Sequence, residues 1–414
     1  MERPNEAPPP PRRIAAGLRI LTDGEMSILR SVFLPRRFRR ETRALFAEPP
    51  PAMAPPPESD VALKRKLTWI PAVASEGRFL SVYMDQNNRC NLKCRMCGFS
   101  DARVAALKKY DLPRSLFEKI CAEVFPRTQF VCLSILTEPF MTRDFPDRLA
   151  LVRKAGVPYS EIITNGTLLD ETNLSKVIEA EVSRLTFSID GGTREVFESI
   201  RTGARFEQVV GAVRLFAALR AARGATRPRI RFNHVLSERN IDAFADFLRL
   251  AEELRPDEMG VRTVSRMSDA EIQESQDPVF WNKVAAARNT LAAFYARTGI
   301  EDSGYLRDRP SRIDLLDGAG APMICRTPWD TLAIHANGDV FPCMAWTRPP
   351  VGNLVLQSFD EIWNGPALEA LRREFADRQP GVDCLNCTIR RGENDPDDDF
   401  FYRKVARPLP DRPA

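Results

Sequence analysis

Short apolar runs alternate with longer amphipathic stretches over residues 76–300. Short apolar runs of this kind are typical of buried strands, and the longer amphipathic stretches are typical of helices packed on a core. Strands are predicted at 79–84, 130–135, 161–164, 184–190, 229–236 and 258–264, and helices at 113–124, 171–180, 206–223 and 241–254. Strands that alternate with helices predict parallel β/α units and therefore an α/β fold.

The pattern changes on both sides of this region. Residues 1–75 form an extension with two proline-rich tracts, at 8–11 and 48–57, and such tracts favour extended spacers. Between the tracts lies an apolar segment followed by closely spaced arginines. We expect a helix on the core with a solvated basic face there, rather than a contact with a membrane or an acidic partner. The later regions are a polar linker at 301–320, a second cysteine group within 321–392 and a flexible tail at 393–414.

The composition narrows the possible functions. The chain has 414 residues, of which 43% are hydrophobic and 28% are charged, so a sizeable core is expected. A formal net charge of +4 gives no reason to expect a nucleic-acid partner. Only two histidines occur, His234 and His335, which argues against a multi-histidine metal site and a histidine-based triad. No apolar run approaches the roughly 18 residues of a membrane span, and the N-terminus lacks the pattern of a signal peptide.

Three cysteines follow the first predicted strand. Cys90, Cys94 and Cys97 are spaced Cys-x3-Cys-x2-Cys, and loops after parallel strands are where β/α barrels place their chemistry. A 4Fe–4S cluster is normally held by four thiolates, so three would leave one iron with an open position. Zinc or buried thiols are the alternatives, although zinc usually takes paired stations of ligands. Thiolate ligands need a reducing compartment, which predicts a cytoplasmic protein.

This cysteine loop resembles the signature of the radical S-adenosylmethionine (SAM) superfamily. In that family the open iron binds the amino and carboxylate groups of SAM. The reduced cluster cleaves SAM to a 5′-deoxyadenosyl radical, which abstracts hydrogen from the substrate. The resemblance implies a partial (β/α)6 barrel, a 4Fe–4S cluster on the three cysteines, and SAM as cofactor. Relatives usually carry an aromatic residue where this chain has Met96, a flexible side chain that can still pack against adenine.

Four further residues match SAM contacts of the family at successive strand ends. Glu138 lies in Leu-Thr-Glu-Pro, which is similar to a Gly-Gly-Glu-Pro motif whose backbone and glutamate bind the amino group of SAM, but the glycines are absent here. Asn165 lies in a Thr-Asn-Gly turn, and the resemblance assigns Ser188 and Arg201 to the ribose and carboxylate of SAM. A solvated acid and a simple turn are the alternatives for the first two. Asp190 is expected to hold its turn through a local Asx-type bond.

Four cysteines lie in the C-terminal region: Cys325, Cys343, Cys384 and Cys387. An Asn-Gly turn before Cys343 predicts a β-hairpin, and a helix is expected over 367–375. This layout resembles the SPASM/Twitch extension of radical SAM enzymes, a small hairpin-plus-helix domain that binds auxiliary 4Fe–4S clusters. Because no cysteine follows in the chain, the resemblance implies one auxiliary cluster with four thiolate ligands, which transfers electrons or braces the fold. Tetrahedral zinc is the alternative.

The remaining cysteines and histidines are expected to be structural. Cys121 falls on a predicted helix and Cys132 in an apolar strand, where thiols behave as small core residues. A hydrogen-bonded structural role is also expected for His234 on the fifth strand and for His335.

The substrate does not follow from these motifs. The first hypothesis is oxidation or epimerisation of a small sugar-like or cyclitol molecule, and the alternative is maturation of a ribosomally made peptide. The small molecule is preferred because residues 1–75 show no strand-rich peptide-recognition module. A hypothesis from another class is a non-catalytic iron–sulfur or zinc protein, which only the altered residues before Glu138 favour. The resemblance also implies an electron donor such as flavodoxin or ferredoxin, and no catalytic residue is assigned beyond the cluster ligands.

Overall fold

One ten-stranded sheet organises the part of the chain that the computed structural model describes, namely residues 77–263, 278–303, 327–346, 348–376, 381 and 384. The strand order is β10-β9-β8-β1-β2-β3-β4-β5-β6-β7. The first seven strands are parallel to their neighbours, which confirms the α/β class and the partial parallel barrel. They are β1 (Leu80–Met84), β2 (Thr128–Cys132), β3 (Tyr159–Thr164), β4 (Arg184–Ser188), β5 (Arg229–Leu236), β6 (Glu258–Thr263) and β7 (Glu301–Asp302).

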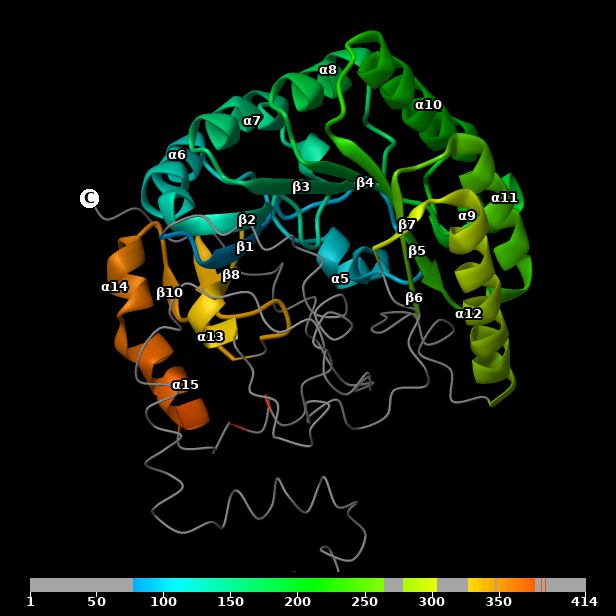
Figure 1. Cartoon of the computed structure of the whole chain (residues 1–414). Coiled ribbons are helices and arrows are strands. Elements are labelled where there is room, and N and C mark those ends of the chain that lie inside the picture. The colour runs from blue at the N-terminus through cyan, green and yellow to red at the C-terminus, as the bar shows by residue number, and fades with distance from the viewer. Residues whose placement is uncertain are drawn as a thin grey trace, which may run out of the picture.

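Helices follow most of these strands and cover one side of the sheet. In Figure 1 the helices α6, α7, α8, α10 and α11 form an arc along its convex side. The helices are α5 (Ala102–Ala105), α6 (Arg114–Glu123), α7 (Phe145–Lys154), α8 (Glu171–Glu179), α9 (Arg194–Ile200), α10 (Phe206–Ala222), α11 (Phe244–Leu254), α12 (Pro278–Thr298), α13 (Thr327–Asp330), α14 (Phe359–Trp363) and α15 (Pro366–Ala376). Short 3-10 helices are η2 (Gly98–Ser100), η3 (Phe125–Arg127), η4 (Pro139–Met141) and η5 (Ile241–Ala243).

The six predicted strands and four predicted barrel helices are all present, and all but β5 have shifted ends. Among the strands the largest shift is in β2, which ends at Cys132 rather than at residue 135. The reason is that the backbone N–H groups of Ile135 and Leu136 donate to the side chain of Asp85 instead of to a neighbouring strand. The sequence analysis missed the helices α7 and α12.

Alternate residues of β4 face opposite sides of the sheet, as expected for a strand. The Phe187 ring packs against Phe216 of α10, with 6.3 Å between ring centroids, so this face is covered by helices. Arg184 points to the concave side, where its guanidinium lies 2.7 Å from Glu161 and 2.9 Å from Glu258. All three side chains are buried, so the concave side of the sheet holds a charged network that spans β3, β4 and β6.

The C-terminal hairpin continues the same sheet. It consists of β8 (Thr331–Ile334) and β9 (Asp339–Phe341), with Gly338 at φ 86° in the turn, which confirms the predicted hairpin. The strand β8 pairs in parallel with β1, and the short β10 (Gly352–Asn353) pairs with β9. Lys119 of α6 donates to the backbone carbonyls of Leu354 and Gln357, at 2.9 Å and 2.8 Å, and thereby ties the region after the hairpin to the barrel.

Several predicted regions lie outside the described residues. These are the extension at 1–75, most of the linker at 301–320 and the tail at 393–414, so their boundaries stay predictions. Among the described helices, none combines the length and the apolar character that crossing a membrane requires.

Candidate cluster and SAM site

The loop that carries Cys90, Cys94 and Cys97 begins directly after β1 and is held by α9 and the residues that follow it. The backbone N–H of Lys93 donates to the carbonyl of Thr202, and that of Arg95 donates to the carbonyl of Ile200, both at 3.0 Å. A tight turn then follows, in which the N–H of Cys97 donates to the carbonyl of Cys94 at 2.9 Å. The loop shape is therefore fixed by backbone hydrogen bonds.

The three thiols form one electrostatic group. Burial raises the pKa of each of them, to about 11 for Cys97. The charges of Cys97 and Cys94 raise the pKa of Cys90 further. Iron lowers such thiol pKa values because it stabilises the thiolate. Among the described residues no three His, Cys, Asp or Glu side chains converge on a single metal ion. A cluster differs from a single ion because it spreads its thiolates over several iron atoms, so the donor set suits iron–sulfur chemistry.

Glu138 is buried beside this loop. Its Oε1 accepts hydrogen bonds from the Thr164 hydroxyl at 2.8 Å and the Phe140 backbone N–H at 3.2 Å. Its Oε2 accepts one from the backbone N–H of Asn165 at 2.8 Å. Burial raises its pKa to about 7, although these hydrogen bonds oppose the rise. Since only 2% of Glu138 is exposed, the alternative of a solvated surface acid is wrong.

Asn165 joins the third strand to the cysteine loop. Its side-chain amide donates to Asn91 at 2.9 Å and approaches the Cys90 sulfur at 3.7 Å. Its oxygen accepts from the Thr167 hydroxyl at 2.6 Å, and Gly166 takes the φ of 79° that an Asn-Gly turn requires. The Thr-Asn-Gly segment is thus both a turn and a wall of the site.

Arg201 reaches the same group of sulfurs from the end of α9. It forms an ion pair with Asp190 at 2.7 Å and hydrogen-bonds to Cys94, where its charge opposes the rise in the thiol pKa. Asp190 also accepts the backbone N–H of Val235 at 2.8 Å, on the next strand. The expected local Asx-type bond is therefore wrong, because this carboxylate is directed at a neighbouring strand and at Arg201. Ser188 is the buried last residue of β4, on the strand beside Asn165.

Sequence reasoning missed Asp85, which lies at the base of the site. It is 2% exposed, and its Oδ1 accepts hydrogen bonds from the backbone of residues 135–137 and from the Thr137 hydroxyl. These partners lie about 50 positions away in the chain, so no local spacing marks them. The only available signal was an acid at the end of the first predicted strand.

The C-terminal cysteines are partly described. Cys343 and Cys384 are half-buried against the main core, whereas Cys325 and Cys387 lie outside the described residues. Arg348 approaches the Cys384 sulfur at 3.9 Å and forms two hydrogen bonds, of 2.8 Å and 2.9 Å, to Glu374 of α15. A guanidinium directed at a sulfur suits a thiolate ligand. The two described thiols therefore fit the chemistry of a cluster.

The other residues predicted to be structural are buried or partly buried. Cys132 is buried and its thiol donates to the carbonyl of Ser134 at 3.0 Å, and Cys121 is partly buried against the core. The Nδ1 of His234 lies 2.8 Å from the carbonyl of Ile189, and burial lowers its pKa to about 4. His335 is buried, with its ring edge-on to Phe341.

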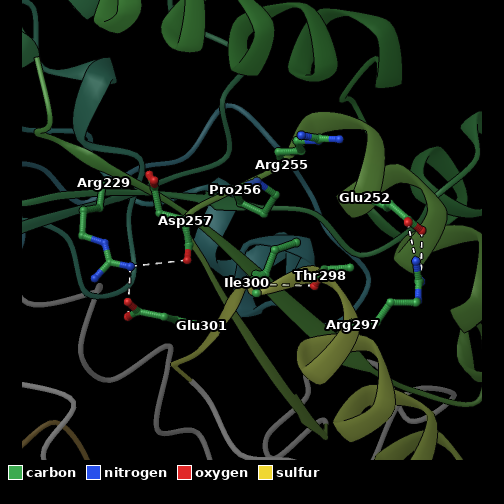
Figure 2. Close-up of a pocket in the computed structure, with 10 residues that line it drawn as sticks. Arg229, Glu252, Arg255, Pro256, Asp257, Arg297, Thr298, Ile300 and Glu301 are labelled. Carbon is green, nitrogen blue, oxygen red and sulfur yellow. Dashed lines mark hydrogen bonds and ion pairs between the residues drawn. The ribbon is translucent and has the colours of Figure 1, made fainter. Parts of the chain in front are cut away.

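A pocket of about 510 Å³ lies at the opposite ends of β5 and β6 from the cysteine loop. Figure 2 shows two ion pairs among its charged side chains, those of Arg229 with Glu301 and of Arg297 with Glu252. None of the predicted site residues lines this pocket. This pocket therefore does not coincide with the predicted site.

Comparisons with known proteins decide the family. The sequence profile of the radical SAM superfamily matches residues 86–251, which span the cysteine loop and all four predicted SAM contacts. This chain contains a radical SAM domain. A second profile, SPASM, described as an iron–sulfur cluster-binding domain, matches residues 325–388. The radical SAM domain implies a 4Fe–4S cluster and SAM, and the SPASM domain implies auxiliary iron–sulfur clusters.

Two curated relatives align with part of this radical SAM protein. A tungsten-containing aldehyde ferredoxin oxidoreductase cofactor-modifying protein from Pyrococcus furiosus is 33% identical over 114 residues, which is 26% of this chain and 30% of the relative. A probable GTP 3′,8-cyclase from Metallosphaera sedula is 32% identical over 123 residues, which is 30% of this chain and 36% of the relative. The chain thus spans about a third of the length of these relatives.

Solved structures share the fold over most of the chain. SuiB from Streptococcus suis, bound to S-adenosylmethionine, gives a TM-score of 0.56 at 16% identity, and the match covers 76% of this chain and 70% of SuiB. The protein anSMEcpe, with bound AdoMet and a peptide, gives a TM-score of 0.55 at 16% identity, and the match covers 79% of this chain and 95% of that one. Identity this low supports the radical SAM fold alone.

Proposed function

We propose that this protein cleaves SAM reductively and uses the resulting radical to remove a hydrogen atom from a substrate. The observation that carries the proposal is that two predicted SAM contacts lie against the cysteine loop: the Glu138 N–H donates to the Arg89 carbonyl at 3.1 Å, and the Asn165 amide lies 3.7 Å from the Cys90 sulfur. When bound, the cluster supplies the electron that breaks the sulfur–C5′ bond of SAM, which leaves methionine and a 5′-deoxyadenosyl radical.

The residues of the chain would bind and orient SAM. Cys90, Cys94 and Cys97 would hold three irons and leave the fourth open. Glu138 would bind the amino group of SAM by accepting hydrogen bonds from its N–H, because hydrogen bonds to an ionised carboxylate are charge-assisted and strong. Arg201 would bind the carboxylate of SAM with the part of its guanidinium that Asp190 does not use. Asn165 and Ser188 would complete the site from the ends of β3 and β4.

The auxiliary site would hold one cluster rather than zinc. Cys325, Cys343, Cys384 and Cys387 would ligate all four irons, which leaves no open position for a substrate. We infer that this cluster transfers electrons, and that a flavodoxin- or ferredoxin-type protein reduces the SAM-binding cluster. Because exposed thiolates and clusters need reducing conditions, we propose a cytoplasmic location.

A peptide is the substrate class with the better support. SuiB has been solved with its precursor peptide SuiA, and this chain shares its fold with a TM-score of 0.58 at 15% identity. The anSMEcpe structure also holds a peptide. The sequence-based preference for a sugar-like or cyclitol molecule stays a prediction. Deuterium that moves from a labelled peptide into 5′-deoxyadenosine would support the peptide, and transfer only from labelled sugars would support the small molecule.

Anaerobic reconstitution tests the proposed reaction. The wild-type protein should bind about eight iron and eight sulfide per chain. With dithionite and SAM it should release 5′-deoxyadenosine and methionine. Cys94→Ala should abolish this release, whereas Cys121→Ala, which changes a thiol of α6 outside the site, should retain it. A wild-type protein that contains its clusters and releases no 5′-deoxyadenosine would overturn the proposal in favour of a non-catalytic iron–sulfur protein.

A further inference from the structure

The segment before Glu138 departs from the family pattern, and its backbone shows how the departure is accommodated. Leu136 and Thr137 stand where relatives have two glycines. Glycine is needed where φ is positive. Among the described residues, however, only Glu181 and Arg255 combine a side chain with a positive φ. Leu136 and Thr137 therefore adopt ordinary backbone angles, and the shape of this segment must have another cause.

That cause is the carboxylate of Asp85. Its Oδ1 accepts the backbone N–H groups of Ile135 and Leu136, both at 3.0 Å, and that of Thr137 at 3.3 Å. The Thr137 hydroxyl donates to the same oxygen at 3.0 Å. Four donors on one buried carboxylate oxygen form a strong, charge-assisted anchor. The carboxylate thus fixes three consecutive peptide groups.

The anchor also sets where the carbonyl groups of this segment point. In a trans peptide the N–H and C=O bonds point in opposite directions. Since the N–H groups of Leu136 and Thr137 point to Asp85, the carbonyls of Ile135 and Leu136 point away from it. Relatives use the backbone of this segment, together with its glutamate, for the amino group of SAM. The carboxylate of Asp85 would therefore fix in this chain the backbone shape that the two glycines permit in the relatives.

A second set of hydrogen bonds joins the anchored segment to the cysteine loop. The backbone N–H of Glu138 donates to the carbonyl of Arg89 at 3.1 Å. The side chain of Asn87 donates to the carbonyl of Glu138 at 2.9 Å and accepts from the N–H of Arg89 at 2.8 Å. Because Cys90 follows Arg89 directly, these hydrogen bonds of residues 85–89 fix the position of Glu138 relative to the first cluster ligand.

We propose that Asp85 is a positioning residue of the SAM site, whose carboxylate holds residues 135–137, and with them the adjoining Glu138, where they bind the amino group of SAM. The proposal rests on the proposed function, because it presupposes that SAM binds beside Glu138. Asp85 does not touch SAM and is not a catalytic residue. Substitution of Asp85 should change the affinity for SAM and leave the iron and sulfide content unchanged. The reason is that the cysteine loop is held separately, by the end of α9 and the residues after it.

Equilibrium binding of SAM to the reconstituted full-length protein, under anaerobic conditions, tests this role. Asp85→Ala removes the acceptor, and we expect its dissociation constant for SAM to rise about 10- to 100-fold, as for other residues that orient ligand-binding groups. Asp85→Asn keeps an acceptor oxygen but loses the charge, so its affinity should fall between those of Asp85→Ala and the wild type. Iron and sulfide contents should stay at the wild-type level in both variants.

Glu161→Gln is the matched control. Glu161 is as buried as Asp85, but its carboxylate accepts hydrogen bonds from Arg184 and Thr186 in the charged network of the concave side, rather than from residues 135–137. Its affinity for SAM should be that of the wild type. Wild-type affinity in Asp85→Ala, or in Asp85→Asn if the alanine variant does not fold, would overturn the proposal. A wild-type protein that fails to bind SAM would instead overturn the proposed function.

Discussion

At the scale of single residues, the buried environment of Glu138 has the clearest consequence for the binding of SAM. Its carboxylate is fully enclosed, and burial holds its pKa at about 7. A carboxyl group with this pKa changes its charge within the physiological range, whereas an ordinary glutamate is ionised throughout it. The hydrogen bond from the amino group of SAM is strong only when it is accepted by the ionised carboxylate. The affinity for SAM should therefore follow the titration of Glu138.

We expect SAM to bind more tightly as the pH rises from about 6 to about 8. Below the pKa of about 7 Glu138 is protonated and neutral, and above it the carboxylate accepts a charge-assisted hydrogen bond from the amino group of SAM. Anaerobic titrations with SAM at a series of pH values measure this. Glu138→Gln should bind weakly with a much flatter pH profile. The same pH profile in wild type and Glu138→Gln would show that another group controls the binding.

The residues that sequence predicts well are those with a local pattern. The three cysteines are marked by their spacing, and Glu138 and Asn165 by short motifs at strand ends. Asp85 has no such mark, because its partners at 135–137 come close only when β1 and β2 pair. The expected local bond of Asp190 failed for the same reason, since its partner Val235 belongs to another strand.

At the scale of elements, α15 and the loop after the hairpin control the surroundings of Cys384. Glu374 on α15 holds Arg348 with two hydrogen bonds, and the guanidinium also packs on the ring of Trp346, 4.6 Å from its centroid. Gly381 leaves room for this pair, because a Cβ at that position would lie 2.5 Å from Arg348. Residues from separate parts of the C-terminal region therefore hold the positive charge of Arg348 near Cys384.

Arg348→Gln should lower the reduction potential of the auxiliary cluster. Reduction adds a negative charge to the cluster, and the guanidinium near its ligand stabilises that charge. A redox titration followed by electron paramagnetic resonance measures the potential, and the SAM-binding cluster serves as the internal control. Arg348→Lys, which keeps the charge, should shift the potential less. An unchanged potential in Arg348→Gln would contradict the assignment, and zinc at this site would give no second signal.

The helices and strands could largely be predicted from the sequence, but the pairing of the C-terminal hairpin with the barrel sheet could not. The alternation of strands and helices follows from the hydrophobic pattern, and the Asn-Gly turn marks the hairpin. Nothing in the pattern of β8 indicates that it pairs with β1, about 250 residues earlier. Such pairing depends on which sheet edge remains open once the barrel has formed. The C-terminal region therefore extends the barrel sheet, which the sequence alone did not indicate.

At the scale of the whole molecule, the buried charges on the concave side link separate parts of the barrel. Arg184 lies between Glu161 of β3 and Glu258 of β6, and Thr186 donates to Glu161 at 2.7 Å. Burial alone would raise the pKa of Glu161, but Arg184 and Arg231 outweigh it, so the pKa lies below its usual value. The ionised network thus stabilises the folded barrel above the ordinary glutamate pKa of about 4.3.

Arg184→Met should therefore destabilise the protein by about 3–5 kcal/mol near neutral pH, because it leaves Glu161 and Glu258 as buried charges without their shared partner. The deficit should shrink as the pH falls below about 4, where the stabilisation of ionised Glu161 is lost from the wild type as well. Urea unfolding of both proteins at several pH values measures it. Arg153→Met, which breaks an exposed pair with Glu181, should cost less than about 1 kcal/mol. Equal costs for the two substitutions would mean that the network contributes no more than a surface ion pair, and that apolar packing alone holds the barrel together.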